Sequence, residues 1–530
     1  MPKGLEDTFG DIIHRMQRQD GVADFAMSVL KWTYLTRRPL SLDELRHALA
    51  VNSTDTSLDR NNLISEKSLL NCCLGLIVID GGTSTVRLVH PLLQEYLHSQ
   101  HEKLFGMGHS DIAQACLTYV NSDIFSGEGA ELDELLEKFP LFEYVSCHWG
   151  YHIREQASQS VQELALSVLL QPTTFQRISQ VLWRSLCPYL PMRPMPFSRL
   201  HLITYFGASN IARLFIEHIN AESKDVQQQV LNSREDVYSS RTPLCAAVRY
   251  GHEALVRLLL EQDNIDVDTK NTFSQTAFSY AAEYGRKELV RLLLERDDVD
   301  INSKDSSGRT PLWYAVFQEQ EAVVQLLLER DDIEVNDKCT INDPPLQNAA
   351  LSGMDAIVRL FLKRSDVDVN IRDNFQQTPL LQAAKHGHEA VVQLLLERDD
   401  IDVNVKNHMG RTPLSMATMM RREAVVRLLL ERDDIDVNVK DHMGRTPLSM
   451  ATTMRREAVA RLLLERDGID VNAEDDKGQT PLNYAINCGC EAVVRLLQER
   501  GAVEGDPNNA KRAPTFGASG SGLFGGWSSS

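Results

Sequence analysis

The stretch that decides the fold is RTPLCAAVRYGHEALVRLLLEQDNIDVD, residues 241–268. Thr242 is suited to cap a short helix, Pro243 fits the first turn, and Gly251 supplies the left-handed residue that ends the helix. A second helix is predicted over residues 253–261, because apolar side chains recur there at helical spacing. The alternating residues after it predict an extended finger. The order is therefore turn, helix, helix and loop.

This unit is repeated along the chain. The tripeptide Thr-Pro-Leu, or a relative of it, returns every 34 residues, with its first residue at Thr242, Thr276, Thr310, Pro344, Thr378, Thr412, Thr446 and Thr480. A fixed period of this size predicts a repeat array, in which each helical hairpin buries its apolar face only against its neighbours.

The repeated unit resembles the ankyrin repeat. The usual Thr-Pro-Leu-His and alanine pair of that family appear here as TPLLQAA, residues 378–384. The histidine of the family is absent throughout, and the unit is one residue longer than usual. Residues 198–217 align as an atypical first unit, so the resemblance implies about nine repeats over residues 198–504. Residues 220–237 are predicted to form a polar insertion that is exposed as a loop.

The N-terminal part has a different pattern. Helices are predicted over residues 25–35, from the capping box that starts at Ser41, and over residues 64–74. Two apolar strands then flank the turn at residues 80–83, which predicts a β-hairpin. Three helices and a hairpin together predict a winged helix.

The predicted fold class is therefore mostly α: a winged helix, a helical linker and an ankyrin-repeat solenoid. An amphipathic connector helix precedes these parts, and a tail rich in glycine and serine follows them. The predicted limits are 1–20 for the connector, 21–100 for the winged helix, 105–197 for the helical linker, 198–504 for the repeats and 505–530 for a disordered tail.

The stretch VRLVHPLLQEYL, residues 86–97, carries a more specific resemblance. It is similar to the end of the winged-helix domain in STAND-type signalling ATPases, notably fungal NACHT proteins with ankyrin tails, whose winged helix is of the GPI inositol-deacylase type. In that family a histidine after the last wing strand reaches the β-phosphate of bound ADP, and His90 stands at the matching position. Pro91 stands where plant relatives have aspartate. The resemblance implies an arm of an NTP-driven switch.

The sequence lacks the phosphate-binding core of such a switch. A P-loop needs Gly-Lys followed by Ser or Thr, and no Gly-Lys dipeptide occurs in the chain. We therefore assign no ATP hydrolysis, no cofactor and no catalytic residue, and His90 is a vestigial nucleotide-sensor position unless another chain or an upstream segment supplies the phosphate site. A plain structural role for His90 is the favoured interpretation.

Two further groups of residues are weighed as sites. Cys147, His148 and His152 share a predicted helix, but no fourth ligand is near, so packing is favoured over metal binding. Arg37 and Arg38 belong to a basic cluster in the predicted winged helix that would fit DNA phosphates. The net charge of −19 favours a protein-binding role instead.

Composition limits the partners and the compartment. The net charge argues against general attraction to nucleic acid or anionic lipid, and it favours protein partners with basic patches. Nine scattered cysteines indicate a reducing compartment, so we expect a cytoplasmic location, with the nucleus as a second compartment that fits. No apolar run approaches the length of a membrane-spanning helix.

A protein partner is expected on the concave surface formed by the fingertips and the first helices. Exposed aromatic and methionine side chains are the expected anchors there. By register these are Tyr250, Phe273, Tyr284, Trp313, Phe317, Phe375, Met409 and Met443.

The predicted function is a non-enzymatic scaffold that serves as the sensor or recognition arm of a STAND signalling protein. A NACHT ATPase module would lie upstream in a longer gene product or act in trans. One alternative is a free-standing ankyrin adaptor that recruits a target to another enzyme. A DNA-binding winged-helix regulator is the third class.

Overall fold

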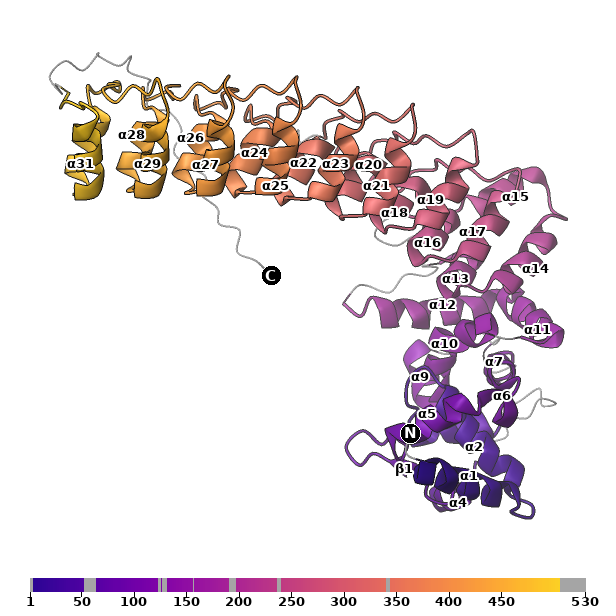
Figure 1. Ribbon diagram of the computed structural model, residues 1–530. Helices are drawn as coiled ribbons and strands as arrows, with labels where there is room; N and C mark the ends of the chain where they lie inside the picture. The colour runs from indigo at the N-terminus through magenta and orange to yellow at the C-terminus, as the bar shows by residue number, and fades with distance from the viewer. Residues whose placement is uncertain are drawn as a thin grey trace. The chain divides into compact units, whose positions relative to one another are not determined.

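The computed structural model describes residues 3–51, 63–122, 125, 131–155, 157–189, 197–235, 240–339 and 344–505 (Figure 1). The chain divides into two compact units, one made of residues 1–281 with 286–300 and the other of residues 282–285 with 301–530. The described part is mostly helical, as predicted.

The first unit begins with the connector and the winged helix. The predicted connector corresponds to α1 (Lys3–Gln17). The winged helix comprises α2 (Ala23–Leu35), α3 (Leu42–Leu49), α4 (Glu66–Cys72), β1 (Ile77–Ile79) and β2 (Val86–Leu88). The strands pair antiparallel, with Ile77 opposite Leu88. The predicted capping box is present: Glu44 N donates to Ser41 Oγ at 3.1 Å, and Ser41 N donates to the Glu44 carboxylate at 2.6 Å. The three predicted helices and the hairpin are thus confirmed.

In the described part of the chain, a series of helices follows the wing. They are α5 (Pro91–Ser99), α6 (His101–Leu104), α7 (Gly108–Val120), α9 (Leu132–Lys138), α10 (Leu141–Glu155), α11 (Gln159–Leu170) and α12 (Pro172–Leu186). The last one, α12, lies within the range predicted for the helical linker. Pro172 starts α12, because a proline in the first turn needs no backbone N–H, and Phe175, Ile178 and Leu182 bury one face of the helix.

The first repeats also belong to this unit. Their hairpins are α13 (Arg199–Phe206) with α14 (Ser209–Ile219), and α16 (Pro243–Tyr250) with α17 (Glu253–Leu260); α18 (Ala277–Glu283) and α19 (Lys287–Leu294) follow. The insertion after α14 is not a plain loop. It contains α15 (Lys224–Leu231), which begins because the Ser223 side chain accepts a hydrogen bond from Val226 N.

The second unit is a stack of helical hairpins (Figure 1). Its helices are α20 (Pro311–Phe317) and α21 (Glu321–Leu328), α22 (Pro345–Ser352) and α23 (Asp355–Leu362), α24 (Pro379–His386) and α25 (Glu389–Leu396), α26 (Pro413–Met419) and α27 (Glu423–Leu430), α28 (Pro447–Thr453) and α29 (Glu457–Glu465), and α30 (Pro481–Asn487) and α31 (Glu491–Glu499). We call the first helix of each pair the inner helix and the second the outer helix.

The repeat period accounts for where the inner helices begin. The threonine side chains at 310, 378, 412, 446 and 480 each accept a hydrogen bond from the backbone N–H three residues on. Arg421 and Arg455 occupy the left-handed position after their inner helices, with φ of 58° and 54°, where the unit at residues 241–268 has Gly251. The limits between the predicted domains remain a prediction, and the predicted tail lies outside the described residues after Gly505.

The loops between repeats form an asparagine ladder that the sequence analysis missed. Asn404 Nδ2 donates to the carbonyl of Asp434 at 2.7 Å, and Asn404 Oδ1 accepts from Asp436 N at 2.9 Å. Both bonds recur in the second unit at Asn302, Asn336, Asn370, Asn438 and Asn472. The ladder satisfies backbone groups of each loop from the preceding repeat, so it fixes the spacing of neighbouring repeats.

Candidate protein-binding surface

Three of the predicted anchors form one row in the second unit. Phe375, Met409 and Met443 lie at the tips of successive fingers, and their exposed fractions are 58%, 42% and 48%. We call these three residues the fingertip row. Such exposure of large apolar side chains at regular positions is typical of an interaction surface.

Backbone hydrogen bonds join the fingers to one another. His408 N donates to the carbonyl of Phe375 at 3.1 Å, and His442 N donates to the carbonyl of Met409 at 3.0 Å. Asp476 N continues the series at Met443, at 3.1 Å. The fingertip row is therefore held in place before any partner arrives, which lowers the entropy lost on binding.

Two glycines allow this close approach. Gly410 and Gly444 have φ of 75° and 76°, a conformation that side chains with a Cβ rarely adopt. A Cβ on Gly410 would lie 2.7 Å from the ring of His442, and one on Gly444 would lie 2.7 Å from Asp476 N. Glycine is thus required at both positions for neighbouring fingers to touch.

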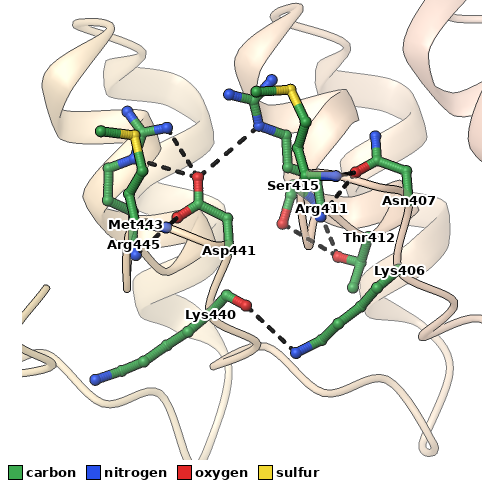
Figure 2. Close-up of polar contacts among 10 residues, drawn as sticks. Lys406, Asn407, Arg411, Thr412, Ser415, Lys440, Asp441, Met443 and Arg445 are labelled. Atoms are coloured by element: carbon green, nitrogen blue, oxygen red, sulfur yellow. Dashed lines mark hydrogen bonds and ion pairs between the residues drawn. The ribbon is translucent and has the colours of Figure 1, made fainter. Parts of the chain in front are cut away.

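A shared carboxylate, that of Asp441, lies next to Met443 of the fingertip row (Figure 2). Asp441 accepts from the backbone N–H of Met443 and of Arg445, at 2.9 and 3.0 Å, and its other oxygen lies 2.8 Å from Arg445 Nη2. Arg411 from the preceding finger approaches the same oxygen with Nε at 3.8 Å. In its own finger Arg411 has the neutral Asn407, which accepts only backbone N–H groups there. One buried carboxylate therefore serves two guanidinium groups.

Two exposed methionines extend the surface and were missed from the sequence. Met420 and Met454 follow the inner helices α26 and α28, and their exposed fractions are 41% and 40%. Both directly precede the arginine in the left-handed position. The duplication of residues 389–422 as 423–456 was the signal that could have found them, because it places the same methionine on two neighbouring repeats.

The two aromatic residues predicted on α20 have different positions. The exposed fraction of Phe317 is 52%, but that of Trp313 is only 4%. The two rings stack with centroids 4.8 Å apart and planes 12° apart, and the Arg309 guanidinium lies 5.3 Å from the Trp313 ring. Trp313 differs from the expectation of an exposed anchor because Phe317 and Arg309 cover it. The buried Trp313 ring thus supports the exposed Phe317 ring by stacking against it.

The remaining predicted anchors are partly exposed. Tyr284, in the second unit, has an exposed fraction of 38%. Tyr250 and Phe273 belong to the first unit, with fractions of 40% and 51%. Tyr250 packs edge-on against Tyr205 at 5.6 Å, and burial raises the pKa of its hydroxyl. Each unit therefore presents its own members of the predicted surface.

His90 caps a helix in the first unit. It is exposed, and its Nδ1 accepts a hydrogen bond from Leu92 N at 3.1 Å, which starts α5. A cavity of about 350 Å³ that His90 lines also has Arg38 and Arg87 in its wall. A second cavity, of about 680 Å³, is lined by residues that include Tyr34, Arg37, His98, His109 and Tyr151, and His90 is not among its lining residues. The capping bond gives His90 a structural role.

His152 of α10 contacts side chains of α7 and of its own helix. His152 Nδ1 lies 2.9 Å from His109 Nδ1, and His152 Nε2 lies 2.9 Å from the Tyr144 hydroxyl. Burial lowers the pKa of His152 to about 3 and that of His148 to about 4, so both are neutral at pH 7. Within the described ranges, no group of three or more possible metal ligands occurs. His109 and His152 thus link α7 to α10.

The described helices are each too short or too polar to cross a lipid bilayer.

Comparison of the sequence with known families gives two matches. Residues 13–120 match the family described as "GPI inositol-deacylase, winged helix domain". Residues 196–271, 264–339, 346–441 and 435–509 match "Ankyrin repeats (3 copies)". No curated protein matches the chain significantly.

Ankyrin repeats are, as a rule, modules that bind proteins and catalyse nothing. The repeat matches extend over more than half of the sequence, and they begin two residues before the cap of α13. This chain belongs to the ankyrin-repeat family.

Proposed function

We propose that the chain is a non-enzymatic scaffold that binds a protein partner on the fingertips and inner helices of its repeats. The fingertip row is the observation that carries the proposal. Its side chains are large, apolar and about half exposed, and the fingers that bear them are joined by backbone hydrogen bonds. A rigid surface with apolar anchors gains the free energy of burial without first having to be ordered.

The proposal has a finer form, in which the chain is the recognition arm of a STAND signalling protein with a NACHT module upstream or in trans. The match of residues 13–120 to a winged helix supports it, together with the position of His90 after the last wing strand. In this form the cytoplasm is the expected location. Transcript sequence upstream of Met1 tests it: an in-frame Gly-Lys-Ser or Gly-Lys-Thr P-loop supports the switch, and a stop codon counts against it.

A free-standing adaptor is the second candidate. It is favoured by the fact that the fingertip row is complete within the second unit and uses no residue of the winged helix. An adaptor would retain its partners when the winged helix is altered, whereas a switch arm would change its partner affinity with the nucleotide state of the NACHT module.

The experiment compares partner capture by the full chain and by surface variants, using cross-linking and mass spectrometry with cell extract. Phe375→Ser, Met409→Ser and Met443→Ser are expected to remove the main partners, because each deletes an exposed apolar anchor. Met107→Ser is the matched control, since Met107 is 47% exposed but lies in the N-terminal part. Equal capture by all four variants would refute the proposed surface.

A further inference from the structure

The duplicated repeats carry their charges on two separate sides. Residues 406–422 and 440–456 comprise a finger and an inner helix each, and they contain four lysines or arginines apiece, against no acidic residue in the first and only Asp441 in the second. Residues 389–405 and 423–439 comprise the outer helices and loops, and each contains five acidic residues. A chain with a net charge of −19 thus has a locally basic face.

Few acidic groups neutralise that face. Asp441 is already engaged by Arg445 and Arg411, and its side chain is only 2% exposed. Arg455 is exposed, and no carboxylate of the described residues pairs with it; Arg421 is 3.6 Å from Glu423, and both side chains are largely open to solvent. Ion pairs this exposed contribute little and leave most of the charge available to a partner.

Not all basic residues of the two segments belong to this face. Figure 2 shows Lys406 and Lys440 on the opposite side of the fingers from Met443 and Arg445. Lys406 Nζ donates to the carbonyl of Lys440 at 3.3 Å, and Lys440 Nζ donates to that of Glu474 at 2.7 Å. These lysines tie neighbouring fingers together. The arginines remain as the charged groups of the face.

Apolar side chains lie among these arginines. Met420 and Met454 directly precede Arg421 and Arg455, and Met443 lies beside Arg445 in Figure 2. Methionine is flexible and polarizable, so it adapts to apolar groups of different shape. We propose that this face binds an acidic segment of a partner protein that also carries bulky apolar side chains. The inference rests on the proposed function and adds the chemistry of the partner.

Other polyanions fit the surface less well. A nucleic acid or an anionic membrane would meet the acidic outer side of the same repeats, and the overall charge of −19 repels an extended polyanion. A second copy of this chain offers acidic loops, but the apolar residues inside them are buried: Ile401 is 5% exposed and Val403 is 1% exposed. A short acidic segment with its own exposed apolar residues meets both requirements.

The test uses the full chain and a random peptide library displayed on phage. Peptides enriched on the chain are expected to combine Asp and Glu with Phe, Leu, Met or Trp, and their affinity is expected to fall as salt rises. Arg421→Asn with Arg455→Asn removes two charges, and asparagine tolerates the left-handed backbone at these positions. This double variant is expected to lower the affinity for the enriched peptides by about threefold to tenfold.

Arg427→Gln with Arg461→Gln is the matched control. It removes the same charge from exposed positions on the outer helices of the same repeats, so it is expected to change the affinity by less than about twofold. Met409→Ser with Met443→Ser tests the fingertip row itself, and is expected to weaken binding by about tenfold or more.

Each result has a definite meaning. Enrichment of neutral or basic peptides, or equal losses in the two arginine double variants, overturns the acidic partner. If the methionine variant still loses binding in that case, the proposed function stands without this inference. If neither the Arg421/Arg455 variant nor the Met409/Met443 variant loses binding, both the proposed function and this inference are refuted. Tighter binding of single-stranded DNA or phosphatidylserine vesicles than of any enriched peptide also overturns the inference.

Discussion

Asp268→Asn is expected to stabilise the protein, because Asp268 interrupts the asparagine ladder. Asn232 makes both ladder bonds within the first unit: Nδ2 donates to the carbonyl of Asn264 and Oδ1 accepts from Asp266 N, at 2.9 and 2.8 Å. Asp268 makes only the second kind, accepting from Asp300 N at 2.9 Å. Its Oδ1 is buried and has no hydrogen-bond partner.

The size of the effect follows from the missing bond. In the other ladder positions the amide donates to a carbonyl about one repeat further on, as Asn302 does to Asp332 at 2.7 Å, 30 residues away. For residue 268 that carbonyl belongs to Asp298. The substitution adds one hydrogen bond and removes a buried acceptor without a partner, and we expect a gain of about 1–3 kcal/mol in the free energy of unfolding at pH 7.

The gain should depend on pH. Burial raises the pKa of Asp268, with the nearby aspartates adding to the shift, so the folded protein holds a proton more readily than the unfolded chain. Stability contributed by this group is therefore lost as pH rises through its folded pKa. At acidic pH the protonated carboxyl can itself donate to the Asp298 carbonyl, so the advantage of asparagine should shrink toward zero.

The assay is urea unfolding of the full chain at several pH values, followed by hydrogen exchange to locate the protected region. Asp263→Asn is the control, because Asp263 is exposed on the same loop and the charge change is identical. A pH-independent gain, an equal gain in the control, or a loss of stability in Asp268→Asn would refute the reasoning.

Three further predictions concern the second unit. Asp441→Asn should destabilise this unit by about 1.5–3 kcal/mol, because Arg445 and Arg411 lose their charged acceptor. The midpoint of urea unfolding measures the effect, and an unchanged midpoint contradicts the prediction. Arg421→Gly should raise the melting temperature, because glycine adopts a positive φ without strain and the relief is worth about 1 kcal/mol. The same substitution should weaken the binding of acidic peptides. Gly410→Ala should lower the melting temperature, because the added Cβ would clash with the next finger. A melting temperature equal to that of the wild type would show that neighbouring fingers need no close contact.

The sequence alone was sufficient to predict the repeat architecture. The threonine caps, the proline in the first turn and the left-handed residue act locally, so a period of 34 residues locates the inner helices of the second unit. The ladder could not be predicted in this way. Asn404 bonds to residues 30 and 32 positions away, and such contacts exist only after the repeats stack. The buried position of Trp313 likewise depends on how Phe317 packs across it.

The net charge says little about any single surface of the duplicated repeats, because it averages over two sides. Acidic residues gather in the outer helices and loops, and basic ones in the fingers and inner helices, so their sum of −19 describes neither side. A partner sees one face at a time, within a screening length of about 10 Å. The basic face therefore favours the opposite partner charge from that expected from composition.

The fingers next to the two duplicated repeats lack the arginine that the duplicated fingers carry. Arg411 and Arg445 occupy the same position in their fingers, whereas the finger before them has Gln377 there and the finger after them has Gln479. Gln377 and Gln479 donate their backbone N–H to an aspartate of their own finger, as Arg445 does to Asp441, and Arg411 donates to Asn407 in the same way. The loop geometry therefore does not require a charge at this position. The loop also forms with glutamine. The guanidinium groups of Arg411 and Arg445 approach the buried Asp441, so the exposed Arg421 and Arg455 are the charges most open to a partner.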